Sequence, residues 1–82
     1  MNLLELNEKL KELGVPDNTY CLNTHLQQER YCISNENGKW ETYFSERGKK
    51  NDLRVFLDES DACSHFLFVI LRDLRSIGVL NK

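Results

Sequence analysis

The chain has 82 residues, of which 40% are hydrophobic and 29% are charged, and its formal net charge is −2 at pH 7. This length favours a single domain, residues 1–82, with a small core, and the composition is that of a globular protein rather than a disordered tail. General nucleic-acid binders and membrane-surface binders usually carry net positive charge, so the slight acidity argues against both classes.

The beginning of the chain lacks the basic segment, the apolar segment and the cleavage site of a signal peptide. The longest apolar run, residues 66–71, is far shorter than the ~20 residues that a membrane-spanning helix needs. Three cysteines without a C-x-x-C pair fit reduced thiols. We therefore expect a cytoplasmic protein with no membrane partner.

A helix is predicted at the start of the chain. Asn2 is suited to cap it, and Gly14 followed by Pro16 is suited to end it. Between them leucine recurs at steps of three and four residues, as expected for one apolar face of an amphipathic helix, at Leu3, Leu6, Leu10 and Leu13.

The clearest local pattern is a β-hairpin. Residues 30–36 and 39–45 read as strands, and Asn37-Gly38 between them suits a two-residue type I′ turn. That turn fixes the register, and cross-strand partners share a face of the sheet. One face is predicted to form the core and contains Tyr31, Ile33, Trp40, Thr42 and Phe44. The other is predicted to be polar and open and contains Cys32, Ser34, Glu36, Lys39, Glu41 and Tyr43.

The remaining elements complete the fold class. Residues 45–52 read as a turn and residues 53–57 as a strand, whereas residues 17–29 leave open whether a strand lies near 19–22. Asp58 is suited to cap a second helix that ends at Gly78. Its predicted buried face consists of Cys63, Phe66, Leu67, Ile70, Leu74 and Ile77. The prediction is a two-layer α+β domain: an N-terminal helix, an antiparallel sheet of three or four strands, and a C-terminal helix, with both helices on the Trp40 face.

Catalytic and metal-binding patterns are absent from the sequence. No nucleophile elbow, P-loop, zinc-protease or dinucleotide motif occurs, and Cys63 and His65 lie two residues apart, which directs them to different sides of a helix. The spacings of Cys21 with His25, and of Cys63 with His65, match no common zinc pattern. We expect neither an enzyme nor a metal or cofactor site.

Several side chains are candidates for binding a partner. Phe68 lies on the charged side of the second helix, where it either contacts a partner or a second copy, or packs on residues 17–29. Tyr43 is a candidate on the polar sheet face. Acidic residues are candidates for contact with a basic partner, namely Glu29, Glu36, Glu41, Asp58, Glu59 and Asp61. One basic cluster, diluted by nearby acids, consists of Arg47, Lys49, Lys50 and Arg54.

The order of elements resembles that of double-stranded RNA-binding domains, which grip the phosphates of A-form RNA. In that family lysines stand at the start of the second helix. Here the corresponding residues, 58–61, read Asp-Glu-Ser-Asp and would repel phosphates. The resemblance is therefore one of topology, and we expect no nucleic-acid partner.

A second resemblance covers residues 13–63. The motifs that carry it are Leu-Gly-Val-Pro at 13–16, Tyr-Cys-Ile at 31–33, Glu-Asn-Gly-Lys-Trp-Glu at 36–41, Tyr-Phe-Ser-Glu-Arg-Gly at 43–48, residues 56–59, and Asp-Ala-Cys at 61–63. With these motifs the sequence resembles a family of small bacterial α+β proteins that serve as immunity proteins of polymorphic toxin systems, including contact-dependent growth inhibition.

This resemblance implies a non-catalytic cytoplasmic inhibitor that binds a toxin domain, often a nuclease, and covers its active site or substrate surface. The expected contact residues are Glu36, Glu41, Tyr43, Asp58, Glu59 and Asp61, with Phe68 as a further contact. Two alternatives remain open. One is a homodimeric adaptor or regulator that pairs through Phe68 or a sheet edge. The other is a nucleic-acid reader that uses the basic cluster.

Overall fold

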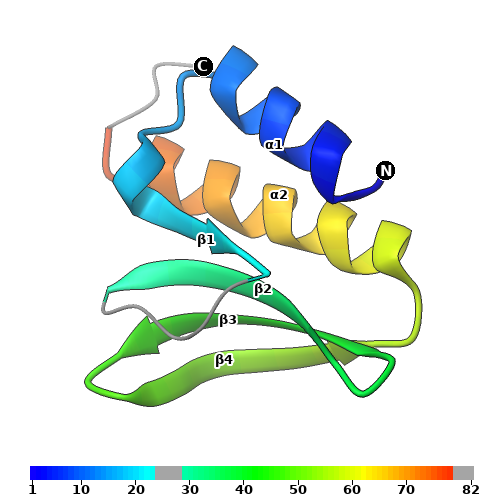
Figure 1. Cartoon of the computed structure of the whole chain (residues 1–82). Coiled ribbons are helices and arrows are strands. Elements are labelled where there is room, and N and C mark those ends of the chain that lie inside the picture. Colours follow the sequence, from blue (N-terminus) through cyan, green and yellow to red (C-terminus); the bar gives the residue numbers. More distant parts are fainter. Residues whose placement is uncertain (24–28, 79–82) are drawn as a thin grey trace.

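The computed structural model describes residues 1–23 and 29–78. Two helices cover one face of a four-stranded sheet, so the chain forms a two-layer α+β fold, as predicted (Figure 1). His25, which was considered above as a possible zinc ligand with Cys21, lies outside the described residues.

Both helices begin at the predicted caps. Helix α1 spans Leu3–Glu12, and the Asn2 side chain accepts a hydrogen bond of 2.9 Å from the backbone N–H of Glu5, while the Glu5 carboxylate accepts one of 3.1 Å from the Asn2 N–H. This reciprocal pair is a capping box. Helix α2 spans Glu59–Ser76, and Asp58 caps it. Because the first N–H groups of a helix have no partner inside the helix, these caps fix where each helix begins.

The sheet has the strand order β1-β2-β3-β4. A short 3₁₀ helix at Asp17–Thr19 leads into β1. The strands are β1 (Tyr20–Leu22), β2 (Arg30–Glu36), β3 (Lys39–Glu46) and β4 (Lys49–Phe56). The hairpin register predicted from Asn37-Gly38 is confirmed, since Cys32 pairs with Tyr43 and Asn35 with Trp40. The question that the sequence left open near 19–22 is answered by β1, which is a strand.

The first strand pairs differently from the prediction. Strand β1 runs parallel to β2, with Cys21 opposite Cys32, so the sheet is mixed rather than wholly antiparallel. A strand of three residues is only about 10 Å long.

The fourth strand is longer than predicted. Residues 45–52 were expected to be a turn, but the turn is only Arg47-Gly48, and β4 starts at Lys49. Arg47 and Gly48 have φ values of 52° and 76°, close to the 54° and 82° of Asn37 and Gly38. Both hairpins therefore turn through two residues with positive φ. A β-bulge between Thr42 and Phe44 shifts the register of β4, and Asp52 there has a φ of 56°.

The core lies between the helices and the predicted sheet face. Its fully buried side chains include Leu6, Leu10, Ile33 and Ile70, and Trp40 packs against them while half-buried. The predicted helical faces are largely confirmed, but Leu13 and Ile77, the C-cap residues of α1 and α2, are exposed.

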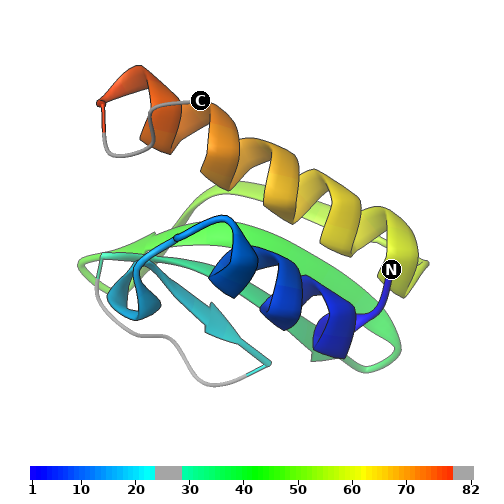
Figure 2. The same cartoon turned by 90° about the horizontal axis from the view of Figure 1, so that it is seen from above.

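The two helices run in the same direction, as both views show (Figures 1 and 2). Their N-termini therefore lie together at one end of the molecule, and their C-termini lie together at the other end. The β2–β3 hairpin is at the same end as the helix N-termini (Figure 1). This arrangement decides which charged residues become neighbours.

Candidate functional site

Acidic residues gather where the two helices begin. We use the name acidic end for the end of the fold that carries Glu36 on the outer sheet face and Asp58, Glu59 and Asp61 at the start of α2. Trp40 pairs with Phe56, so the turn that follows Glu36 and the segment that leads into α2 leave the sheet at the same end of the strands. Lys39, the partner of Glu36 in the hairpin, is a basic residue at this end. Four predicted contact residues are thus brought to one end of the fold.

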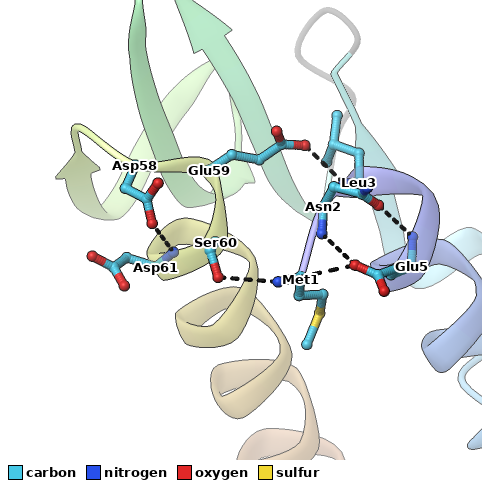
Figure 3. Close-up of polar contacts among 8 residues, drawn as sticks. All are labelled: Met1, Asn2, Leu3, Glu5, Asp58, Glu59, Ser60 and Asp61. Atoms are coloured by element: carbon cyan, nitrogen blue, oxygen red, sulfur yellow. Dashed lines mark hydrogen bonds and ion pairs between the residues drawn. The ribbon is translucent and has the colours of Figure 1, made fainter.

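Two of these carboxylates have structural roles (Figure 3). Asp58 accepts a hydrogen bond of 3.2 Å from the backbone N–H of Asp61. Glu59 reaches across to α1 and accepts one of 2.9 Å from the backbone N–H of Leu3. Glu59 therefore joins the start of α2 to the start of α1, which sequence reasoning about a partner surface did not find.

The other two carboxylates are not used in this way. Within residues 1–23 and 29–78, neither Glu36 nor Asp61 makes a side-chain hydrogen bond or ion pair, and both are exposed. Figure 3 shows the Asp61 carboxylate pointing away from the contact between the helices. Asp61 lies in the first turn of α2, where the positive end of the helix dipole favours negative charge. Asp61 is therefore available to an external cation, whereas Glu36 also interacts electrostatically with Lys50, whose pKa it helps to raise.

Apolar side chains are exposed next to the acidic end. Leu57, which links β4 to α2, is 82% exposed, and Leu4 in the first turn of α1 is also exposed. Exposed apolar groups bordered by charges have the composition of a protein-binding surface, in which a water-excluding centre is surrounded by a polar rim. Sequence analysis did not single out either leucine, because each reads as part of an amphipathic pattern.

The opposite sheet face differs from the prediction. Tyr43, expected to be an open contact residue, is only 6% exposed. It forms a row with Cys32 and Cys21 across three strands, and Lys50 lies 5.0 Å above its ring. Burial raises the pKa of the Tyr43 hydroxyl. Tyr43 is therefore a buried residue and is withdrawn as a partner contact.

Glu41 on the same face is engaged within the chain. Its carboxylate lies 2.7 Å from Lys50 Nζ and is half-buried. This hydrogen bond is the largest cause of a raised pKa at Lys50. Another member of the basic cluster, Arg54, lies 3.8 Å from the Asp52 carboxylate. Lys50 and Arg54 of the basic cluster thus lie beside acids, which weakens the attraction of the cluster for phosphate.

Phe68 is exposed, as the prediction that it contacts a partner or a second copy requires. It is 60% exposed on α2, and the Arg72 guanidinium lies 5.7 Å from the centre of its ring. It lies on a different side of α2 from the buried residues Phe66 and Ile70, which face the sheet. Phe68 is therefore remote from the core and does not belong to the acidic end.

Cys63 and His65 have separate environments. Cys63 is fully buried in the core, where burial raises its pKa to about 11, so the thiol is protonated at neutral pH. His65 instead packs edge-on against Phe56, with ring centres 5.3 Å apart, and its pKa is lowered by burial and by Arg54. Among the described residues no group of three or more His, Cys, Asp or Glu side chains is arranged to hold a metal ion.

A groove between α2 and the sheet was not predicted. Its volume is about 260 Å³, and its floor includes Tyr31 and Phe44, whose rings meet edge-on at 4.9 Å. Val69 and His65 line it from α2, and Asp52 from β4. The groove exists because α2 leaves β4 uncovered: every residue of β4 except Phe56 is exposed. Only the packing of the helix on the sheet reveals it.

Polar groups converge on one wall of the groove. The Tyr31 hydroxyl donates a hydrogen bond of 2.7 Å to Asp73 Oδ2, and Arg72 Nε donates one of 3.0 Å to Asp73 Oδ1. Burial and this acceptor raise the pKa of Tyr31 far above its usual value, so the hydroxyl stays protonated. The polar groups on this wall, Tyr31, Arg72 and Asp73, are therefore engaged in hydrogen bonds with one another.

Comparisons with known proteins identify no relative of this chain: no family model, curated protein or solved structure matches. In the part of the chain that the structure describes, neither helix has the length and apolar character needed to cross a bilayer.

Proposed function

We propose that the chain is a non-catalytic immunity protein that binds a toxin domain, expected to be a nuclease, and covers its active site or substrate surface. The observation that carries this proposal is the acidic end, where Glu36 and Asp61 are exposed and make no side-chain hydrogen bond or ion pair within residues 1–23 and 29–78, and where Leu57, next to Asp58 in the chain, is exposed. The sequence motifs at residues 13–63 support the same class of protein.

The physical argument is one of complementarity. A nuclease needs a basic cleft to hold phosphates, and carboxylates on a compact protein can occupy the same cleft. Opposite charges also steer the two proteins together and speed association, an effect that weakens as salt is added. The exposed leucines add apolar area, which contributes affinity that does not depend on salt.

The experiment uses the gene next to the one that encodes this chain. Its product, or the C-terminal domain of that product, is co-expressed with the chain, purified as a complex and tested for toxicity in the presence and absence of the chain. We expect a stable complex and protection of cells. A neighbouring product that is toxic but neither binds the chain nor is neutralised by it would refute the proposal.

The surface is tested with matched variants. Glu36→Gln combined with Asp61→Asn removes two charges from the acidic end and keeps the shape of both side chains, whereas Glu46→Gln removes one charge at the opposite, β3–β4 end. We expect the double variant to weaken toxin binding at least tenfold, mostly through a slower association rate, and Glu46→Gln to change it less than about twofold. Equal effects of the two would show that the acidic end is not the contact surface.

An alternative function, a homodimeric adaptor, is favoured by the exposure of Phe68. Pairing through the β4 edge is less favourable, since the bulge at Asp52 and the lysines at Lys49 and Lys50 are features that block strand addition at sheet edges. Light scattering coupled to gel filtration separates the two functions. A dimer that becomes monomeric in Phe68→Asp would support the adaptor, and a monomer would support the immunity protein.

A further inference from the structure

The groove beside α2 has the size of a site for one side chain. Its volume of about 260 Å³ is below the about 300–1,000 Å³ of pockets that enclose whole small ligands. Tyr31 and Phe44 form an aromatic floor, and Val69 from α2 provides an apolar wall. A flat ring placed here would contact the aromatic floor and Val69.

The charges around the groove are already compensated. Asp73 accepts hydrogen bonds from Tyr31 and Arg72, and Asp52 lies 3.8 Å from Arg54. A lysine or arginine side chain in the groove would be repelled by the guanidinium groups of Arg72 and Arg54, which already pair with the two carboxylates. An acidic side chain would be repelled by the carboxylates of Asp73 and Asp52. Charge complementarity favours an occupant without net charge.

Hydrogen-bond acceptors remain at the mouth of the groove. Asp52 is exposed, and its carboxylate has more acceptor positions than its single contact with Arg54 uses. Burial and the nearby Arg54 lower the pKa of His65, which favours the neutral ring, in which one nitrogen accepts a hydrogen bond. A neutral ring that carries an N–H or O–H donor satisfies these acceptors without introducing a charge.

We propose that this groove receives an aromatic side chain with a hydrogen-bond donor, a tyrosine or tryptophan, presented by the protein partner. The identity of that partner as a toxin domain rests on the proposed function, whereas the chemistry of the groove does not. Tyrosine and tryptophan are the residues that most often dominate the energy of an interface when they fill a pocket on the partner. The acidic end then supplies attraction, and the groove supplies an anchor.

The test of the groove uses the isolated chain and p-cresol, which reproduces a tyrosine side chain. Titration is followed by backbone amide chemical shifts in two-dimensional NMR. We expect saturable shifts at Phe44, His65 and Val69 with a dissociation constant on the order of 1–10 mM, as for a fragment of this size. Toluene, which lacks the hydroxyl, and propylguanidinium, which mimics arginine, are expected to bind at least threefold more weakly.

Two tryptophan variants provide a matched control. Val69→Trp fills the groove and is expected to weaken p-cresol binding at least tenfold, whereas Phe68→Trp places the same residue on the exposed side of α2 and is expected to change it less than twofold. Val69→Met, a smaller filling, is expected to give a partial loss and keeps the test valid should Val69→Trp not fold. Asp52→Asn retains an acceptor oxygen and is expected to preserve binding within about threefold.

Three results would overturn the proposal: no saturable shift at the groove, tighter binding of propylguanidinium than of p-cresol, or unchanged p-cresol binding in both Val69 variants. These results leave the proposed function standing, because they require no toxin. Conversely, a chain that binds p-cresol in the groove but does not bind or neutralise the neighbouring toxin would refute the immunity function and retain the site.

Discussion

Glu59 offers the sharpest test of how the two helices are joined. Its carboxylate accepts a hydrogen bond of 2.9 Å from the backbone N–H of Leu3, 56 residues away in the chain, and this N–H lies in the first turn of α1 where no helical partner exists. Glu59→Ala removes the acceptor, whereas Glu59→Gln removes the charge and keeps an oxygen. The pair of variants separates hydrogen bonding from charge.

The magnitude follows from the environment of this bond. A hydrogen bond to a charged group contributes about 1.5–3 kcal/mol. Because the contact here is only partly buried, we expect Glu59→Ala to lose about 1–2 kcal/mol, around the lower end of that range. For a domain of 60–100 residues each kcal/mol shifts the melting temperature by roughly 4–8 °C. Glu59→Ala should therefore melt at least about 4 °C below the unchanged protein, and Glu59→Gln should lose less than half as much.

Thermal unfolding followed by circular dichroism measures both effects, with Asp61→Asn as the control because its carboxylate takes no part in the contact between the helices. We expect Asp61→Asn to lower the free energy of unfolding by less than about 0.5 kcal/mol. Equal losses in Glu59→Ala and Glu59→Gln would show that charge, not the bond to Leu3, stabilises this end. No loss in either would refute the role of Glu59 altogether.

Three further predictions concern the core, the second hairpin and pH. Ile33→Ala should lower the free energy of unfolding by about 2–5 kcal/mol in urea titrations because Ile33 is fully buried, whereas Ile77→Ala should change it by less than about 0.5 kcal/mol. Gly48→Ala should lose about 1 kcal/mol by the same measurement, since φ there is +76° although the space is open. Burial raises the pKa of Cys63 from 9.0 to about 11, so the folded chain keeps a proton that the unfolded chain releases. Stability should therefore fall as pH rises from about 9 to about 11, and Cys63→Ala should flatten that slope; an unchanged slope would contradict the assignment.

The helices and the first hairpin were predictable because their signals are local. Asn37-Gly38 suits positive φ at both positions, and the structure has 54° and 82° there. Asp58 at the start of α2 and Asn2 at the start of α1 are typical capping residues, and both cap as expected. Each of these features depends on side chains within a few residues of the backbone they fix.

The second hairpin and the first strand were less predictable because their signals are weak or distant. Arg47 adopts a φ of 52°, which an arginine rarely does. The sequence therefore contains no sign of a two-residue turn before β4, and residues 45–52 were predicted to be a longer turn. The parallel pairing of β1 contributes to the burial of Tyr43, since it places Cys21 beside Cys32 in the same buried row. Alternation along β3 alone places Tyr43 on the second sheet face and does not reveal that this part of the face is buried.

The candidate site was predicted in part. The acids at the start of the second helix and Glu36 do lie at one end, but the pattern did not reveal that Glu59 joins the two helix starts, or that Glu41 pairs with Lys50. The groove depends on residues from three strands and α2, whose juxtaposition is set by the helix leaving β4 uncovered. Such a site has no signature in any single segment.

The central claim is that the acidic end binds a basic toxin domain. Its most direct test is calorimetric titration of the neighbouring gene's toxin domain into the chain, into Glu36→Gln combined with Asp61→Asn, and into Glu46→Gln, each at low and high salt. We predict that the double variant loses at least tenfold in affinity at low salt, that high salt narrows this difference, and that Glu46→Gln binds as the unchanged chain does. Binding that is indifferent both to the double variant and to salt would contradict the claim.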